Sequence, residues 1–193
     1  MATSKVLQTY GTQLMFADHA VDFAGQAPAT AANSFIVGSP TSVQMNFSVI
    51  AAAAAWESAK TATLAHIGTA WPIKWTLGAV MESTATPAAG GTFNFYWNAS
   101  PSATAGTGNS GEASGTDAAI AITHLQALIY IGAIHVRANV INKDSNIGSL
   151  WLPHLYGSLI MVNNTSVAMV ADADADECFA VLTPVLDDIQ AAA

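Results

Sequence analysis

The sequence has few charged residues, and residues of positive sign are the scarcest. Only 9% of its 193 residues are charged, against about 25% in a typical soluble domain. Five lysines and arginines, scattered along the chain, oppose 13 acidic residues and leave a net charge of −8. Because proteins bind phosphate backbones through lysine and arginine, this balance argues against a nucleic-acid partner.

A pair of cysteines, a secretory signal and long apolar runs are also missing. The chain has one cysteine, Cys178, so no internal disulfide can form. Its start, MATSKVLQTYG, has neither the basic nor the apolar region of a signal peptide. No apolar run approaches the roughly 18 residues of a membrane-spanning helix. We therefore expect a protein made in a cytoplasm, without a membrane partner.

What the sequence has in excess is apolar material. Hydrophobic residues make up 52% of the chain. Together with the low charge, this content favours a surface that is largely covered by partners. A merely neutral surface of small residues is the alternative.

No catalytic or phosphate-binding motif is present. The five histidines never fall in HExxH or another close ligand spacing. No GxSxG motif surrounds a serine, and GTGNSG lacks the lysine of a phosphate loop. His135 and Cys178 lie within apolar segments and are interpreted as packing residues. The sequence therefore predicts no enzyme and no cofactor.

The most metal-like segment is DADADE, with Asp172, Asp174 and Asp176 at alternate positions. This spacing resembles the opening of an EF-hand loop. However, Glu177 stands where the sharp turn needs glycine, and Thr183 where a bidentate glutamate belongs. We interpret the segment as a solvated acidic turn, with a calcium site as the weaker alternative, and predict no bound metal.

Apolar residues alternate cleanly with polar ones after residue 40. In SVQMNFSV, for example, every second side chain is apolar, which predicts a strand with one buried face. We expect PIKWTLGAVMES to pair with TFNFYWNAS, and a strand over 58–66. Further strands are predicted in LIYIGAIHVRANV, YGSLIMVNN, VAMVA and CFAVLTPVL, and polar turns in NKDSNIG, NNTS and DADADE.

Short strands at this spacing indicate an all-β fold, an antiparallel β-sandwich or a barrel. A helix of one or two turns is expected only in GTDAAIAITHLQALIY, with Thr116 or Asp117 as N-cap. The expected core residues are Val43, Met45, Phe47, Trp75, Phe93, Phe95, Ile131, Leu159, Met161, Phe179 and Val181.

The first 40 residues differ from the rest. Their apolar residues are interrupted by glycine and proline and keep no period for more than a few residues. The sequence predicts an extended arm over 1–40 and a sandwich domain over 41–193. Leu14, Phe16 and Phe35 would then be contacts to a partner. An irregular first strand of the core within 1–20 is the alternative.

A long stretch poor in charge and bulk follows the aromatic strand in GGTFNFYWNASPSATAGTGNSGEASGTDAA, residues 90–119. Such a long tract is uncommon as a free loop in a compact domain. We expect residues 98–119 to lie flat along a neighbouring protein, with Asn98 and Asn109 as contacts. A mobile surface loop is the alternative.

This tract, followed by LQALIYIGAIHV, YGSLIMVNNTSVA and CFAVLTPVLDDIQ, resembles small jelly-roll structural proteins of tailed bacteriophages, of the head-decoration (cement) or head-fibre type. The similarity covers roughly residues 40–190 and rests on packing and turn motifs. It implies a jelly-roll-like sandwich in the virion, assembled in the host cytoplasm. It further implies a homo-oligomer, most simply a trimer, bound to the major capsid protein or other virion proteins.

The leading hypothesis is therefore a non-enzymatic protein on the outside of a phage head. The alternative is a tail or fibre-tip module that binds a host glycan, since jelly rolls often bind sugars. Trp151, in GSLWLPHLYG, is the best candidate for an exposed stacking ring or partner contact. An enzyme such as a glycan hydrolase is the least favoured hypothesis.

Overall fold

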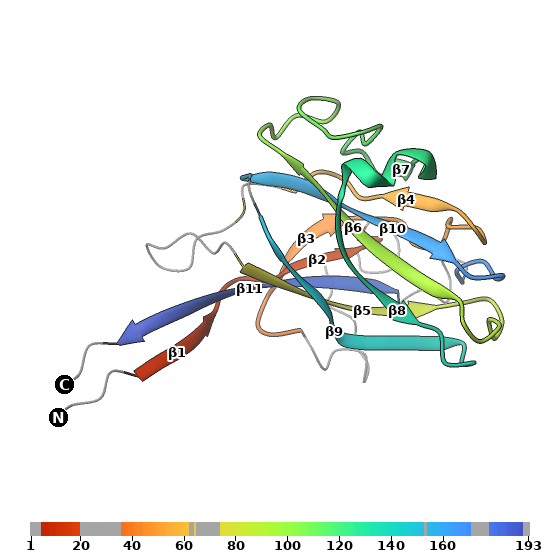
Figure 1. Cartoon of the computed structure of the whole chain (residues 1–193), viewed down its shortest axis with the longest axis horizontal. Helices are drawn as coiled ribbons and strands as arrows, with labels where there is room; N and C mark the ends of the chain where they lie inside the picture. The colour runs from red at the N-terminus through yellow and green to blue at the C-terminus, as the bar shows by residue number, and fades with distance from the viewer. Residues whose placement is uncertain are drawn as a thin grey trace.

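The structure is a computed structural model of the whole chain, and it describes residues 5–19, 36–61, 64, 74–152, 154–170 and 178–190. Their strands form two sheets that pack face to face (Figure 1). The described residues contain no α-helix, only the 3-10 turn η2 (Ile122–Ala127). The prediction of an all-β sandwich is confirmed.

Sheet A has the strand order β3-β2-β11-β5-β9, and β1 attaches to β11. Its pairs are antiparallel except for β2 and β3, which are parallel. The strands are β1 (Lys5–Tyr10), β2 (Leu14–Ala17), β3 (Thr41–Gln44), β5 (Lys74–Glu82), β9 (Ile141–Trp151) and β11 (Phe179–Gln190).

Sheet B is antiparallel and has the order β7-β4-β10-β6-β8. Its strands are β4 (Ala55–Glu57), β6 (Thr92–Ser100), β7 (Ala118–Ala119), β8 (Ile129–His135) and β10 (Tyr156–Asn164). The bounds of β6 and β10 are those of the predicted segments. The predicted pairing of β5 with β6 is wrong, because the connection between them crosses from sheet A to sheet B.

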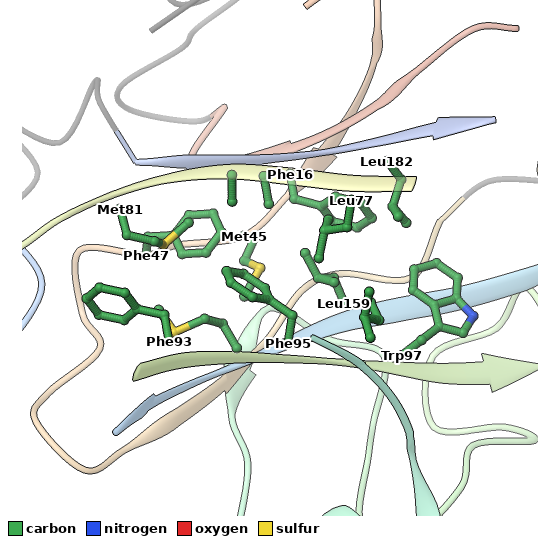
Figure 2. Packing of buried hydrophobic residues seen from close by; sticks show 14 of the residues in the cluster. Phe16, Met45, Phe47, Leu77, Met81, Phe93, Phe95, Trp97, Leu159 and Leu182 are labelled. Atoms are coloured by element: carbon green, nitrogen blue, oxygen red, sulfur yellow. The ribbon is translucent and has the colours of Figure 1, made fainter. Parts of the chain in front are cut away.

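The core fills the space between the sheets. Side chains from alternate positions of both sheets meet there, and Figure 2 shows Phe16, Met45 and Leu77 facing Phe93, Phe95 and Trp97. Every residue of the predicted core is buried. Two of them, Phe179 and Val181, belong to a smaller apolar cluster, while their neighbours Ala180 and Leu182 point into the main core. Strand alternation therefore places the smaller cluster on the other face of sheet A.

Part of the predicted arm belongs to the sandwich. β2 pairs with β11 on one side and with β3 on the other. Leu14 and Phe16 are buried in the main core, with 3% and 0% of their surface exposed. Their predicted role as partner contacts is therefore wrong, and the boundary at residue 40 does not hold for residues 14–17. Phe35 lies outside the described residues.

Some strands differ from the predicted ones. A polar turn was expected at NKDSNIG, which instead forms the middle of β9, an edge strand whose backbone pairs along the whole of β5. The strand predicted over 58–66 ends earlier, since β4 covers Ala55–Glu57 and the described residues 58–61 are not in a strand. Within VAMVA, the structure shows an isolated bridge at Met169.

The two sheets approach closely where β8 meets β9. A Cβ atom on Gly132 would overlap the carbonyl oxygen of Ile147, and one on Gly148 would overlap the carbonyl oxygen of Ile131. Only glycine allows two backbones to come this close. These two glycines therefore let an edge of sheet B lie directly against an edge of sheet A.

Candidate functional site

The tract of residues 101–117 is an ordered cover on the outer face of sheet B, and the carboxylate of Glu57 holds it. Glu57 is 1% exposed. Its Oε2 accepts hydrogen bonds from the backbone N of Ser114 (2.6 Å) and from the Ser114 hydroxyl (3.1 Å). Its Oε1 accepts bonds from the backbone N of Gly115 (2.8 Å) and the hydroxyl of Ser158 (2.5 Å). A buried carboxylate is stable in such a place only when donors surround it in this way.

Lys60 fastens an earlier part of the same tract. Its Nζ donates to the carbonyl oxygens of Thr104 and Thr107, each at 2.9 Å, and to the hydroxyl of Ser100 at 3.0 Å. Burial lowers the pKa of Lys60 below its ordinary value of 10.5, and the nearby charge of Glu57 opposes this change. The ammonium group thus holds two turns of the loop against the end of β6.

Asp117 closes the tract at its far end. Its Oδ1 accepts hydrogen bonds from the indole of Trp56 (2.6 Å) and from the backbone N of Asn46 (2.9 Å). Its predicted role as a helix N-cap is wrong, because η2 begins after Ala121 and no side chain caps it. Asp117 instead links the tract to the segments that carry β3 and β4.

Asn98 is part of this internal network. It is 0% exposed, and its Nδ2 donates to the Ser158 hydroxyl at 2.9 Å and to Asn109 Oδ1 at 3.2 Å. Its Oδ1 accepts a bond from the backbone N of Ser110. Asn98 therefore serves the fold and is not available as the predicted partner contact, while Asn109 remains half-buried. The Nδ2 atom of Asn109 is buried without a hydrogen-bond partner among the described residues.

Beside the cover, an open groove of about 390 Å³ lies on the outer face of sheet B. Tyr96 of β6 and Tyr130 of β8 form its floor, with ring centroids 5.2 Å apart and planes tilted by 59°. Burial raises the pKa of Tyr96 above its ordinary 10.0; Tyr130 adds to this rise and a hydrogen bond with Asn94 opposes it. The other lining residues are Asn94, Leu125, Gln126 and Leu128.

The groove is neutral and amphipathic. Its lining combines phenol and amide groups with leucine side chains and contains no charged residue. Tyr130 is 55% exposed, so one aromatic face is open to solvent. Residues of η2 and the residue after it, Leu128, supply one wall of the groove.

A two-stranded ribbon is a further candidate surface. β1 pairs with the second half of β11, from Tyr10 opposite Val185 to Lys5 opposite Gln190. Pairing of β11 with β5 ends at Val185, so beyond it β1 is the only partner of β11 among the described strands. In Figure 1 this ribbon extends away from the sandwich. Each of its strands therefore has an edge that no described strand pairs.

Trp151, the remaining predicted contact, lies at the end of β9 and is 63% exposed. The acidic segment with Asp172, Asp174 and Asp176 lies outside the described residues. Within the part of the chain that the structure describes, no group of three potential metal-ligating side chains comes together, and no helix is long and apolar enough to cross a membrane. No protein-family model, curated protein or solved structure matches this chain.

Proposed function

We propose that this chain is a non-enzymatic structural protein of a phage virion, a decoration protein bound to the outside of the head. The motifs between residues 40 and 190 support this proposal by their resemblance to such proteins. The structural feature that supports it most strongly is the projecting ribbon of β1 and β11. An element of this kind reaches beyond the core of its own subunit and can pair with another chain.

The ribbon is suited to assembly for a physical reason. A two-stranded ribbon alone in water is at best marginally stable, and its unpaired edges present rows of free backbone N–H and C=O groups. Pairing with a strand of another subunit satisfies these groups. We therefore propose that the ribbon joins copies of the chain into a homo-oligomer, most simply a trimer, or attaches the oligomer to the capsid protein.

Deleting residues 2–10 tests this role. Because β2 lies in the core and β1 pairs only with β11 among the described strands, the deletion is expected to leave a folded sandwich. The truncated protein should be a monomer by light scattering and should no longer bind bare heads. A matched control replaces residues 2–10 with glycine and serine, which keeps the length and weakens strand pairing.

Two results would contradict the proposal. One is a truncated protein that keeps the full-length oligomer and binds heads with unchanged affinity. The other is a count of only a few copies per particle, because decoration of the head requires many copies.

The groove on sheet B favours a second candidate, a fibre-tip module that binds a host glycan. Aromatic rings with adjacent amides offer both a stacking face and hydrogen-bond partners to a neutral sugar. A glycan array probed with the wild-type protein, Tyr130→Ala and Trp151→Ala tests this candidate. Loss of a signal only with Tyr130→Ala assigns it to the groove, loss only with Trp151→Ala assigns it to the end of β9, and no signal at all rejects the candidate.

A further inference from the structure

Positive charge gathers at one recess beside the turn between β8 and β9. The recess has a volume of about 290 Å³. Arg137 and Lys143, two of only five lysines and arginines in the chain, line it together with His135. These residues are spread over nine positions in sequence, and the reversal of the chain between the two strands brings them to one cavity. The other lining residues are Ile134, Asn139, Ile141, Asn142 and Asp144.

The turn that shapes this recess is braced from within. Asn142 is 3% exposed; its Oδ1 accepts a bond from the backbone N of Arg137 (2.9 Å), and its Nδ2 donates to the carbonyl of Asn139 (2.7 Å). Ala138 has a φ of +52°, a left-handed conformation that costs an alanine about 1 kcal/mol or more. The surrounding bonds hold this conformation in place, so the recess is preformed.

The cationic groups at the recess are available to a ligand. The side chains of His135, Arg137 and Lys143 are exposed, so the interpretation of His135 as a packing residue is wrong. Neither Arg137 nor Lys143 makes an ion pair with any residue that the structure describes. The one carboxylate of the lining, Asp144, accepts a hydrogen bond from the backbone N of Asn146 (2.9 Å). Two cations and one carboxylate leave one net positive charge, in a chain whose net charge is −8.

We propose that this recess binds a single oxyanionic group, a carboxylate, phosphate or sulfate. The planar fork of an arginine matches the paired oxygens of such groups, and a lysine adds a point charge beside it. The polar side chain of Asn139 is a further donor in the lining. Such an oxyanionic group occurs both as a free ion and as an acidic side chain of a partner protein. The recess would bind the negatively charged oxygens in either case.

The test is a titration of the full-length, isotope-labelled protein at constant ionic strength. Binding is monitored through the NMR chemical shifts of its backbone amides. One arm uses sodium phosphate, a second sodium sulfate, and a third a short acetylated glutamate peptide, with sodium chloride as the reference. We expect saturable shifts confined to residues 134–144. Arg137→Gln and Lys143→Gln should each weaken this binding by about tenfold, as expected for the loss of one charged hydrogen bond. Lys74→Gln, which removes the same charge from β5, is the matched control and should change it less than twofold.

The outcomes separate cleanly. Saturable binding of phosphate or sulfate alone identifies a free ion as the ligand, and tighter binding of the peptide identifies an acidic partner segment. Shifts that do not saturate, that spread over all basic residues, or that persist unchanged in both Arg137→Gln and Lys143→Gln would overturn the proposal. Because both side chains are exposed, these variants should keep the wild-type pattern of shifts elsewhere, and the double variant Arg137→Lys/Lys143→Arg, which keeps both charges, should keep the binding.

Discussion

The two faces of sheet B are stabilised in different ways. On the inner face, Phe93, Phe95 and Trp97 of β6 are completely buried against the other sheet. On the outer face of the same strand, Tyr96 lines the open groove, and Asn98 bonds to a cover of small residues that polar side chains hold in place. One strand therefore serves an apolar core on one side and a hydrogen-bond network on the other.

This difference has a consequence for how each side tolerates change. Apolar contacts have no preferred direction. The stability of the core therefore depends on how well its total volume is filled, and many residues contribute to it. Hydrogen bonds to a buried carboxylate are directional, and five of those on the outer face end on Glu57 alone. We therefore expect the core to set global stability and the network to set the local order of the cover.

The largest effect should follow from a cavity on the inner face. Phe95→Ala is expected to lower the free energy of unfolding by about 3–5 kcal/mol, because the ring is fully buried. Tyr96→Ala, one position along the same strand but half-buried on the outer face, is the matched control and should cost much less. Denaturant unfolding of both variants measures the difference, and equal losses would contradict the contrast between the two faces.

The next effect concerns the close contact between β8 of sheet B and β9 of sheet A. Gly148→Ala would force a methyl group into the carbonyl oxygen of Ile131, and overpacking of this kind typically costs about 1–3 kcal/mol. Gly91→Ala is the control, since the nearest atoms to its methyl would be the side chain and Cα of Thr165, at 3.2 Å or more. Thermal unfolding should rank Gly148→Ala clearly below Gly91→Ala; the reverse order would show that β8 and β9 are not in such close contact.

A loss of similar size, but confined to the cover, is expected when the outer network is broken at its centre. Glu57→Gln replaces one acceptor oxygen with a donor that faces the N–H groups of Ser114 and Gly115, and a buried donor left without a partner costs about 1–3 kcal/mol. Glu112→Gln makes the same change at an exposed carboxylate of the tract and should cost less, because water can solvate an exposed group that loses a bond.

Hydrogen exchange gives the sharper readout for Glu57→Gln. Amides of residues 101–117 should exchange faster, while those of β6 and β10 keep their protection. Uniform loss of protection over the whole sandwich would show that Glu57 supports the core rather than the cover.

The smallest effect is a dependence of stability on pH that arises from Lys60. Burial lowers the pKa of its ammonium group below 10.5 in the folded protein, so the unfolded chain keeps this proton to higher pH. Stability should therefore rise with pH from the lowered pKa up to about 10.5 and then level off. The half-exposed position of Lys60 keeps this rise small.

Unfolding measured from about pH 8 to pH 11 in the wild type and in Lys60→Met isolates the effect of Lys60. The rising component should be missing from the variant. The raised pKa of Tyr96 acts in the opposite direction above pH 10.0 and is common to both proteins, so it cancels in the comparison. Identical pH profiles would show that Lys60 does not lose solvent in the folded state.

Much of the fold could be predicted from the sequence, because alternation is a local signal. The bounds of β6 and β10 follow from apolar residues at every second position, whereas β11 and the second half of β5 carry consecutive buried residues because both of their faces are covered. β9 carries no such signal. Its middle residues are polar and largely exposed, and it becomes a strand because β5 offers it a backbone to pair with.

The candidate sites were harder to predict. The sequence drew attention to the glycine- and serine-rich tract and to Trp151, and the ring of Trp151 is indeed exposed. It did not indicate that Glu57 holds the tract, or that Arg137 and Lys143 line the same recess. Asn98 was expected at a surface, but it is buried. The sequence could not reveal this, because nothing in it shows whether the amide of an asparagine bonds to water or to other side chains.

By itself, then, the sequence determined the all-β class, most of the strands and the apolar interior, since each depends on neighbours two positions apart along the chain. Only the tertiary structure decided which strands share a sheet, where the first strands belong and what holds the cover. The bonds of Glu57 reach residues 41 to 101 positions away, and those of Asp117 reach residues 61 and 71 positions away. No local pattern encodes contacts over such separations, because they arise only when the packed sheets bring distant segments together.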